Sequence, residues 1–186
     1  MKSYLKGILA QSMILVSSLN ANNQFEAIKY TKGSWVMQAT FFEEGKWATP
    51  KSPVSAVADT TLNDAFIRMR VPVEFPDTVF QFEMTLSFDR FNNTYRLAFL
   101  DDVNGFMDIY SGTMRDGILT VTNAETGSTF PDGNGGKVIG KLEIQAVDKG
   151  FQIRAYTSSK PQGPYTPYMK LDFKSADSSK HKKAQQ

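Results

Sequence analysis

The side chains that could do chemistry in this chain are carboxylates, tyrosines and arginines, because the usual nucleophiles and metal ligands are scarce. There is no cysteine, and the single histidine, His181, lies among lysines near the end of the sequence. A serine nucleophile would therefore lack a histidine base, and a zinc or haem site would lack its usual ligands. The sequence predicts no catalytic residues, no metal site and no bound cofactor.

Asp108 and Tyr110 are the best candidates for polar groups inside the fold. They are two residues apart in a segment that is expected to be a strand, so both side chains lie on one face, which they share with Phe106. Three charged residues of other expected strands alternate with apolar neighbours and should face solvent instead: Arg68, Arg70 and Glu83.

These side chains are positioned by a series of short strands that we expect over residues 79–123. From Phe80 to Phe88 every second residue is apolar, which is the period of a half-buried strand. Three further runs follow, separated by residues typical of tight turns: Asn92-Asn93, residues 101–105, and Asp116-Gly117. The pattern predicts an antiparallel meander.

More strands are expected on both sides of the meander. A short helix over residues 24–32 should end at Gly33 and lead into strands at 33–44, 54–61 and 65–73, with a loop at 46–53. Pro72 indicates that the third strand ends or reaches a sheet edge there. After a loop at 128–136 without strand pattern, strands are expected at 138–147, 151–157 and 168–174. Nine or ten strands can close into one antiparallel barrel, so the fold class is all-β.

The first 21 residues are expected to be a signal peptide. Lys2 and Lys6 precede an apolar segment from Ile8 to Leu19, and Leu19-Asn20-Ala21 resembles a cleavage site. The apolar segment is too short to cross a hydrocarbon layer about 30 Å thick. We therefore expect a periplasmic or secreted protein, with no stable membrane insertion after cleavage.

Residues 22–174 are expected to form the barrel domain, followed by a disordered basic tail over residues 175–186. The whole chain has 21 basic and 19 acidic residues. The signal peptide removes two lysines, and the tail removes three lysines and one aspartate, so the domain keeps fewer basic than acidic groups. A slightly negative domain is a poor nucleic-acid binder. Without cysteine, an exported domain relies on its aromatic core.

The pattern of glycine, tryptophan, aspartate and tyrosine residues in the central region resembles that of a bacterial family known only as a domain of unknown function. The resemblance covers roughly residues 30–125 and is carried by Gly33-x-Trp35, Leu86-Ser-Phe88-Asp89, Asn93-Thr-Tyr95, Phe99-Leu100-Asp101, Tyr110-Ser-Gly112 and Asp116-Gly117-x-Leu119. The chain departs from the pattern between Lys51 and Asn63, where a glycine-bearing turn is expected. The resemblance implies a lipocalin-like β-barrel and no established activity.

The same resemblance suggests a role for Trp35. In lipocalin-type barrels a Gly-x-Trp start closes the bottom of the barrel, and an arginine from a late strand lies across the indole. Arg154 is the candidate for that arginine. The alternative is that Trp35 is an ordinary aromatic residue of the core, and in both cases its role is structural.

The leading functional hypothesis is a non-catalytic protein that binds a small hydrophobic molecule in the barrel cavity. The residues expected to line that cavity are Phe82, Met84, Tyr95, Leu97, Phe99, Asp108 and Tyr110. An isomerase or cyclase, in which a tyrosine or carboxylate moves a proton, is the first alternative. A structural or interaction module with a filled interior is the second. The sequence leaves the oligomeric state open.

Overall fold

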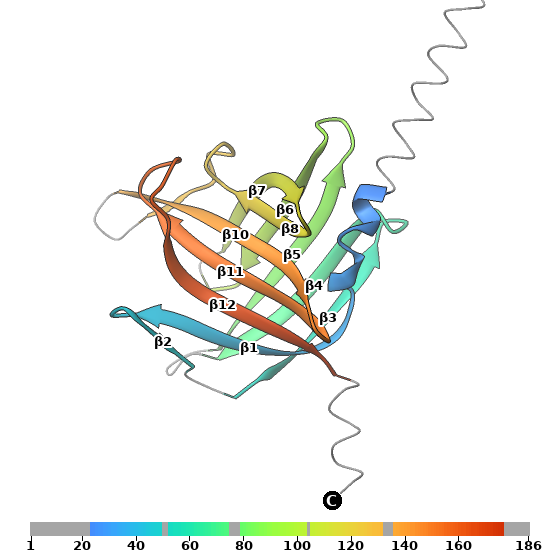
Figure 1. Ribbon diagram of the computed structural model, residues 1–186, viewed down its shortest axis with the longest axis horizontal. Helices are drawn as coiled ribbons and strands as arrows, with labels where there is room; N and C mark the ends of the chain where they lie inside the picture. The colour runs from blue at the N-terminus through green and yellow to red at the C-terminus, as the bar shows by residue number, and fades with distance from the viewer. Residues whose placement is uncertain (1–22, 50–51, 75–78, 104, 132–135, 177–186) are drawn as a thin grey trace, which may run out of the picture.

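A ring of ten antiparallel strands forms a closed barrel (Figure 1). The computed structural model describes residues 23–49, 52–74, 79–103, 105–131 and 136–176. The strands of the ring are, in order, β1 (Gly33–Glu43), β3 (Val54–Thr61), β4 (Phe66–Glu74), β5 (Val79–Asp89), β6 (Thr94–Asp101), β7 (Phe106–Arg115), β8 (Ile118–Thr122), β10 (Lys137–Val147), β11 (Gly150–Ser158) and β12 (Thr166–Ser175). Each pairs with the next, and β12 pairs with β1. The all-β barrel and its central meander are confirmed.

Two short strands lie outside the ring and are absent from the sequence prediction. β2 (Lys46–Ala48) pairs with the end of β1, and β9 (Phe130–Pro131) pairs with the start of β10. Both fall in segments expected to be loops. β2 is exposed throughout, so it carries no alternating pattern. It adopts strand structure because it pairs with the longer strand β1.

Pro72 marks a local sheet edge, as expected, although its strand does not end there. β4 continues to Glu74 and keeps its pairing with β5. Its pairing with β3 stops at Val57 opposite Arg70. Among the described residues the strand therefore pairs on one side only beyond Arg70, and a proline without an N–H is tolerated at such an edge.

Residues 23–31 lie at one end of the barrel, which we call the helix end (Figure 1). The helix expected over residues 24–32 is shorter than predicted, with one turn at 23–26 and a 3-10 segment, η1 (Lys29–Thr31). The hydroxyl of Tyr95 donates to the carbonyl of Gln24 at 3.0 Å, and this bond ties the segment to β6. The opposite end, which carries the connections from β8 to β10 and from β11 to β12, is called the loop end.

Trp35 is buried at the helix end, but its expected contact with Arg154 is wrong. The indole N–H donates to the Thr31 carbonyl at 2.9 Å, and the ring packs edge-on against Phe151 with centroids 5.1 Å apart. Arg154 is exposed because Ile153 and Ala155 on either side of it face the interior. An aromatic ring therefore takes the place expected for the arginine.

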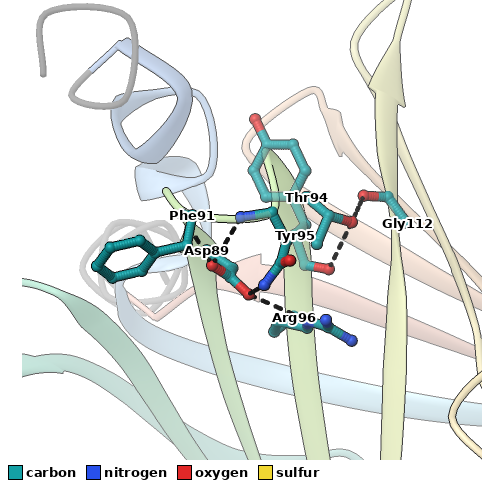
Figure 2. A network of polar contacts seen from close by, with 7 residues as sticks. Asp89, Phe91, Thr94, Tyr95, Arg96 and Gly112 are labelled. Carbon is teal, nitrogen blue, oxygen red and sulfur yellow. Dashed lines mark hydrogen bonds and ion pairs between the residues drawn. The ribbon is translucent and has the colours of Figure 1, made fainter. Parts of the chain in front are cut away.

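The turn between β5 and β6 is held by the carboxylate of Asp89 (Figure 2). It accepts from the backbone N–H groups of Phe91 at 3.0 Å and Asn92 at 3.1 Å, and from the Asn92 side chain at 2.7 Å. These bonds, led by the Asn92 side chain, lower the pKa of Asp89. Figure 2 also shows Thr94 reaching β7, where its hydroxyl donates to the Gly112 carbonyl at 2.8 Å. The Asn92-Asn93 turn is confirmed.

Alternate side chains from the strands of the ring face the interior and form one apolar cluster. Phe151 and Phe173 stack with centroids 4.2 Å apart, and both are buried in the same cluster as Leu97 and Leu119. On the outer face Glu83 binds Arg68 at 2.7 Å and Arg70 at 3.0 Å. These three charged residues face solvent, as expected.

The expected signal peptide at 1–21 lies outside the described residues, as does all but the first two residues of the expected tail at 175–186. Residue 22 is likewise outside the described part. No helix within the described ranges is long and apolar enough to cross a membrane.

Candidate functional site

A cluster of polar groups is buried inside the otherwise apolar barrel, toward the loop end. Asp108 and Asn123 are both 0% exposed, and Tyr110 is 6% exposed. The Asn123 side-chain amide donates to both carboxyl oxygens of Asp108, at 3.1 and 2.9 Å. Its own carbonyl oxygen accepts from the backbone N–H of Gly140 at 2.7 Å. We call Asp108, Tyr110, Asn123 and Gly140 the polar cluster.

Three strands place these residues together. Alternation along β7 points Asp108 and Tyr110 to the same inner face, which settles the face left ambiguous by Phe106. Asn123 follows the last residue of β8 and continues the inward row of Leu119 and Val121. Gly140 lies on β10, where a Cβ would come within 2.5 Å of the Tyr110 hydroxyl. The glycine therefore makes room for the tyrosine ring.

The segment after β8 is held against β7 by its own polar bonds. The Asn123 amide also donates to the Ser128 carbonyl at 2.8 Å, and the Ser128 hydroxyl accepts from the Ile109 N–H at 3.0 Å. The Thr126 hydroxyl donates to the Ile109 carbonyl. These bonds satisfy the backbone of β7 where β8 has ended. The segment after β8, which includes Asn123 of the polar cluster, is therefore held in place against β7.

Burial keeps the Tyr110 hydroxyl protonated. Its pKa is raised well above the usual value, first by desolvation and then by the Asp108 carboxyl beside it. A neutral phenol can donate one hydrogen bond and accept others. The cluster therefore presents hydroxyl, amide and carboxyl groups, and its only side chain with measurable exposure is Tyr110.

All seven residues expected to line a cavity face the interior, but they lie at different depths. Phe82 and Phe99 are stacked with centroids 5.1 Å apart, and Phe99 keeps some exposure. Met84 is buried two residues further along β5. Tyr95 and Leu97, at 2% and 1% exposure, lie toward the helix end within the packed core. The structure thus groups Phe82 and Phe99 with Asp108 and Tyr110, and sets Tyr95 apart.

The comparisons with known proteins place the chain in a family. A family model described as "Protein of unknown function (DUF1579)" matches residues 21–177, more than half of the chain. The chain belongs to this family. A comparison with curated proteins finds no match. The family resemblance expected from residues 30–125 is therefore confirmed, and the family description assigns no activity to the barrel.

Sequence reasoning missed two members of the polar cluster in this DUF1579 protein. Asn123 follows a strand and resembles an ordinary turn residue, and Gly140 interrupts the alternation of β10 without a turn around it. A glycine inside an apolar strand is a signal for close approach of another group. That signal was available in the sequence, but the identity of the approaching group, Tyr110, was not.

Among the described residues no group of three or more His, Cys, Asp or Glu side chains could hold a metal ion. The buried polar side chains of the same residues all have hydrogen-bond partners. The cluster is thus a satisfied network of hydrogen bonds.

Proposed function

We propose that the barrel binds a small, mostly apolar molecule at its loop end, in contact with Phe82, Phe99 and Tyr110. The supporting observation is that apolar and polar inward groups with some exposure lie together near the loop end. Phe99 is partly exposed, Phe41 is 8% exposed and Tyr110 is 6% exposed, whereas Leu97 and Leu119 are 1% and 0% exposed. A guest at the loop end would therefore meet both kinds of group.

The chemistry of this region favours a guest with one polar group. Phe82 and Phe99 offer stacked apolar rings, and Tyr110 offers a neutral hydroxyl. Burying about 250 Å² of apolar ligand surface would contribute about 6 kcal/mol before association costs. A lipid or isoprenoid fragment fits these groups better than a sugar or a nucleotide.

A proton-transfer enzyme is the second candidate, because Asp108 and Tyr110 lie side by side in the interior. Against it, Asp108 is 0% exposed and both of its oxygens accept from Asn123, so its geometry suits a structural tie. A catalytic residue must reach the substrate. A filled interior with no guest is the remaining alternative.

N-Phenyl-1-naphthylamine, a neutral apolar fluorophore, tests the proposal. We expect saturable binding to the delipidated protein, loss of binding in Phe82→Arg, and unchanged binding in Gln81→Arg. Gln81 is the matched control because it is exposed on the outer face beside Phe82. Absence of saturable binding to the wild type, or equal binding by folded Phe82→Arg, would favour the filled interior.

We also propose that the protein is exported, on the basis of the basic and apolar start of the sequence. Mass spectrometry of protein recovered from the native cells tests this proposal. The expected mass is that of a chain starting near residue 22 in the periplasmic or secreted fraction. A chain that retains residue 1 and stays in the cytoplasm would contradict it.

A further inference from the structure

A pocket lies on the outer wall of the barrel, apart from the polar cluster. It has a volume of about 310 Å³ and is bounded by β2, β11 and β12. Its side-chain walls include Trp47, Arg154, Tyr156 and Lys170. β2 and β12 pair with opposite edges of β1 (Figure 1), so β1 runs between the two sides of the pocket.

The strand register shows that the polar side chains of this pocket point away from the interior. Ile153 and Ala155 face the core, so Arg154 and Tyr156 face outward. Arg154 is directly opposite Lys170 on β12, whose neighbour Leu171 is buried. A guest in this pocket would therefore not compete with a guest inside the barrel.

Two cations meet at the floor of the pocket. Like charges on directly opposed residues of neighbouring strands destabilise a sheet. Lys170 has an acidic partner, Asp172, at 3.1 Å. Arg154 donates to the neutral side chain of Gln152 and forms no direct ion pair with a described residue. Glu143 on β10 is directly opposite Arg154, but its carboxylate is bound by Lys141 at 2.8 Å and by Tyr156 at 2.9 Å. The remaining N–H groups of its guanidinium suit a bidentate anion such as a carboxylate.

Aromatic rings form the walls beside these cations. Trp47 is 48% exposed and packs against Phe42 with ring centroids 5.1 Å apart. Tyr156 is held in place by its hydrogen bond to Glu143 at 2.9 Å and by the ammonium of Lys141, 4.2 Å from its ring centroid. The rings are therefore supported before any ligand arrives.

We propose that this outer pocket binds a small planar aromatic carboxylate, with the carboxylate on Arg154 and Lys170 and the ring beside Trp47 and Tyr156. The volume is near the lower limit for small-molecule sites, which suits a ligand of one or two rings. An anion bound between Arg154 and Lys170 would be attracted by both charges. The nearby carboxylates of Glu143 and Asp172 already hold partners, so the pocket offers little to a cationic ligand.

Isothermal titration with 2-naphthoate tests the proposal, with neutral 2-naphthamide as the matched ligand. We expect saturable binding of the naphthoate and weakening by about tenfold or more for naphthamide and for Arg154→Gln. Trp47→Ala should weaken both ligands, because it removes a wall and leaves the cations in place. Arg96→Gln is the control, since Arg96 on β6 is paired with Asp89 on β5 and lies outside the pocket.

The interior variant Phe82→Arg separates this site from the proposed barrel site. Naphthoate binding that survives Phe82→Arg and fails in Arg154→Gln supports the outer pocket, whatever the result with the neutral fluorophore. Equal affinity for naphthoate and naphthamide overturns the proposal. So does naphthoate binding that is lost in Phe82→Arg and retained in Arg154→Gln.

Discussion

At the scale of single residues, Phe82 and Gln81 test the inward and outward faces of β5. Phe82 is 2% exposed and stacks on Phe99, whereas Gln81 is exposed. Phe82→Ala should lower the free energy of unfolding by about 3–5 kcal/mol. Gln81→Ala should change it by less than about 0.5 kcal/mol. Urea denaturation measures the free energy of unfolding of both variants. Equal losses would show that the inward and outward faces of β5 are assigned incorrectly.

Asn123 is expected to matter more for stability than its place after a strand suggests. Asn123→Ala removes the amide that both Asp108 oxygens accept from and leaves the carboxyl buried without that donor. We expect a loss of at least about 2 kcal/mol by chemical denaturation. In an Asp108→Ala background the same substitution should cost less, because no carboxyl is left without its donor. Equal costs in the two backgrounds would show that the two residues are not coupled.

At the scale of elements, Tyr110 on β7 can lie against β10 because Gly140 has no side chain. A Cβ at Gly140 would lie 2.5 Å from the Tyr110 hydroxyl and 3.0 Å from its ring. Gly140→Ala should therefore destabilise the protein by about 1–3 kcal/mol through overpacking. Tyr110→Phe removes the closest atom of this contact, so the double variant should lose less than the sum of the single losses. Additive losses would indicate that Gly140 is required for another reason.

At the scale of the whole molecule, buried tyrosines predict loss of stability at high pH. Burial, with a contribution from Tyr95, raises the pKa of Tyr30 from 10.0 to about 12. The pKa values of Tyr95 and Tyr110 are also raised, in both cases mainly by desolvation. Because the unfolded chain releases these protons first, their stabilising contribution is complete below about pH 10 and is lost as the pH rises through the folded pKa values.

Tyr30→Phe tests this dependence. At pH 7 the variant should be less stable by about 1 kcal/mol, because the hydrogen bond from Tyr30 to the Ile144 carbonyl is lost. Between pH 10 and pH 12 the difference from wild type should shrink, since a phenylalanine has no proton to release. Urea midpoints measured across this range give the comparison, and a constant difference would exclude a role for Tyr30 in alkaline unfolding.

The sequence by itself determined the class of the fold because strand alternation and turn chemistry are local. Phe82, Met84 and Leu86 alternate with polar residues, and the bounds of β3 at Val54–Thr61 agree with the predicted strand. The inward direction of Asp108 and Tyr110 was also predictable, since it depends on parity along one strand.

Only the tertiary structure decided which of these side chains meet. Asn123 reaches Asp108 across 15 residues of sequence, and Arg154 comes to lie opposite Lys170 across β11 and β12. Phe151 lies beside Trp35 in place of the expected Arg154, and this contact also joins residues that are far apart in the sequence. Such contacts depend on the register between strands and on the closure of the ring, in which β1 pairs with β12. These are set by the packing of the whole interior, and no short stretch of sequence contains them.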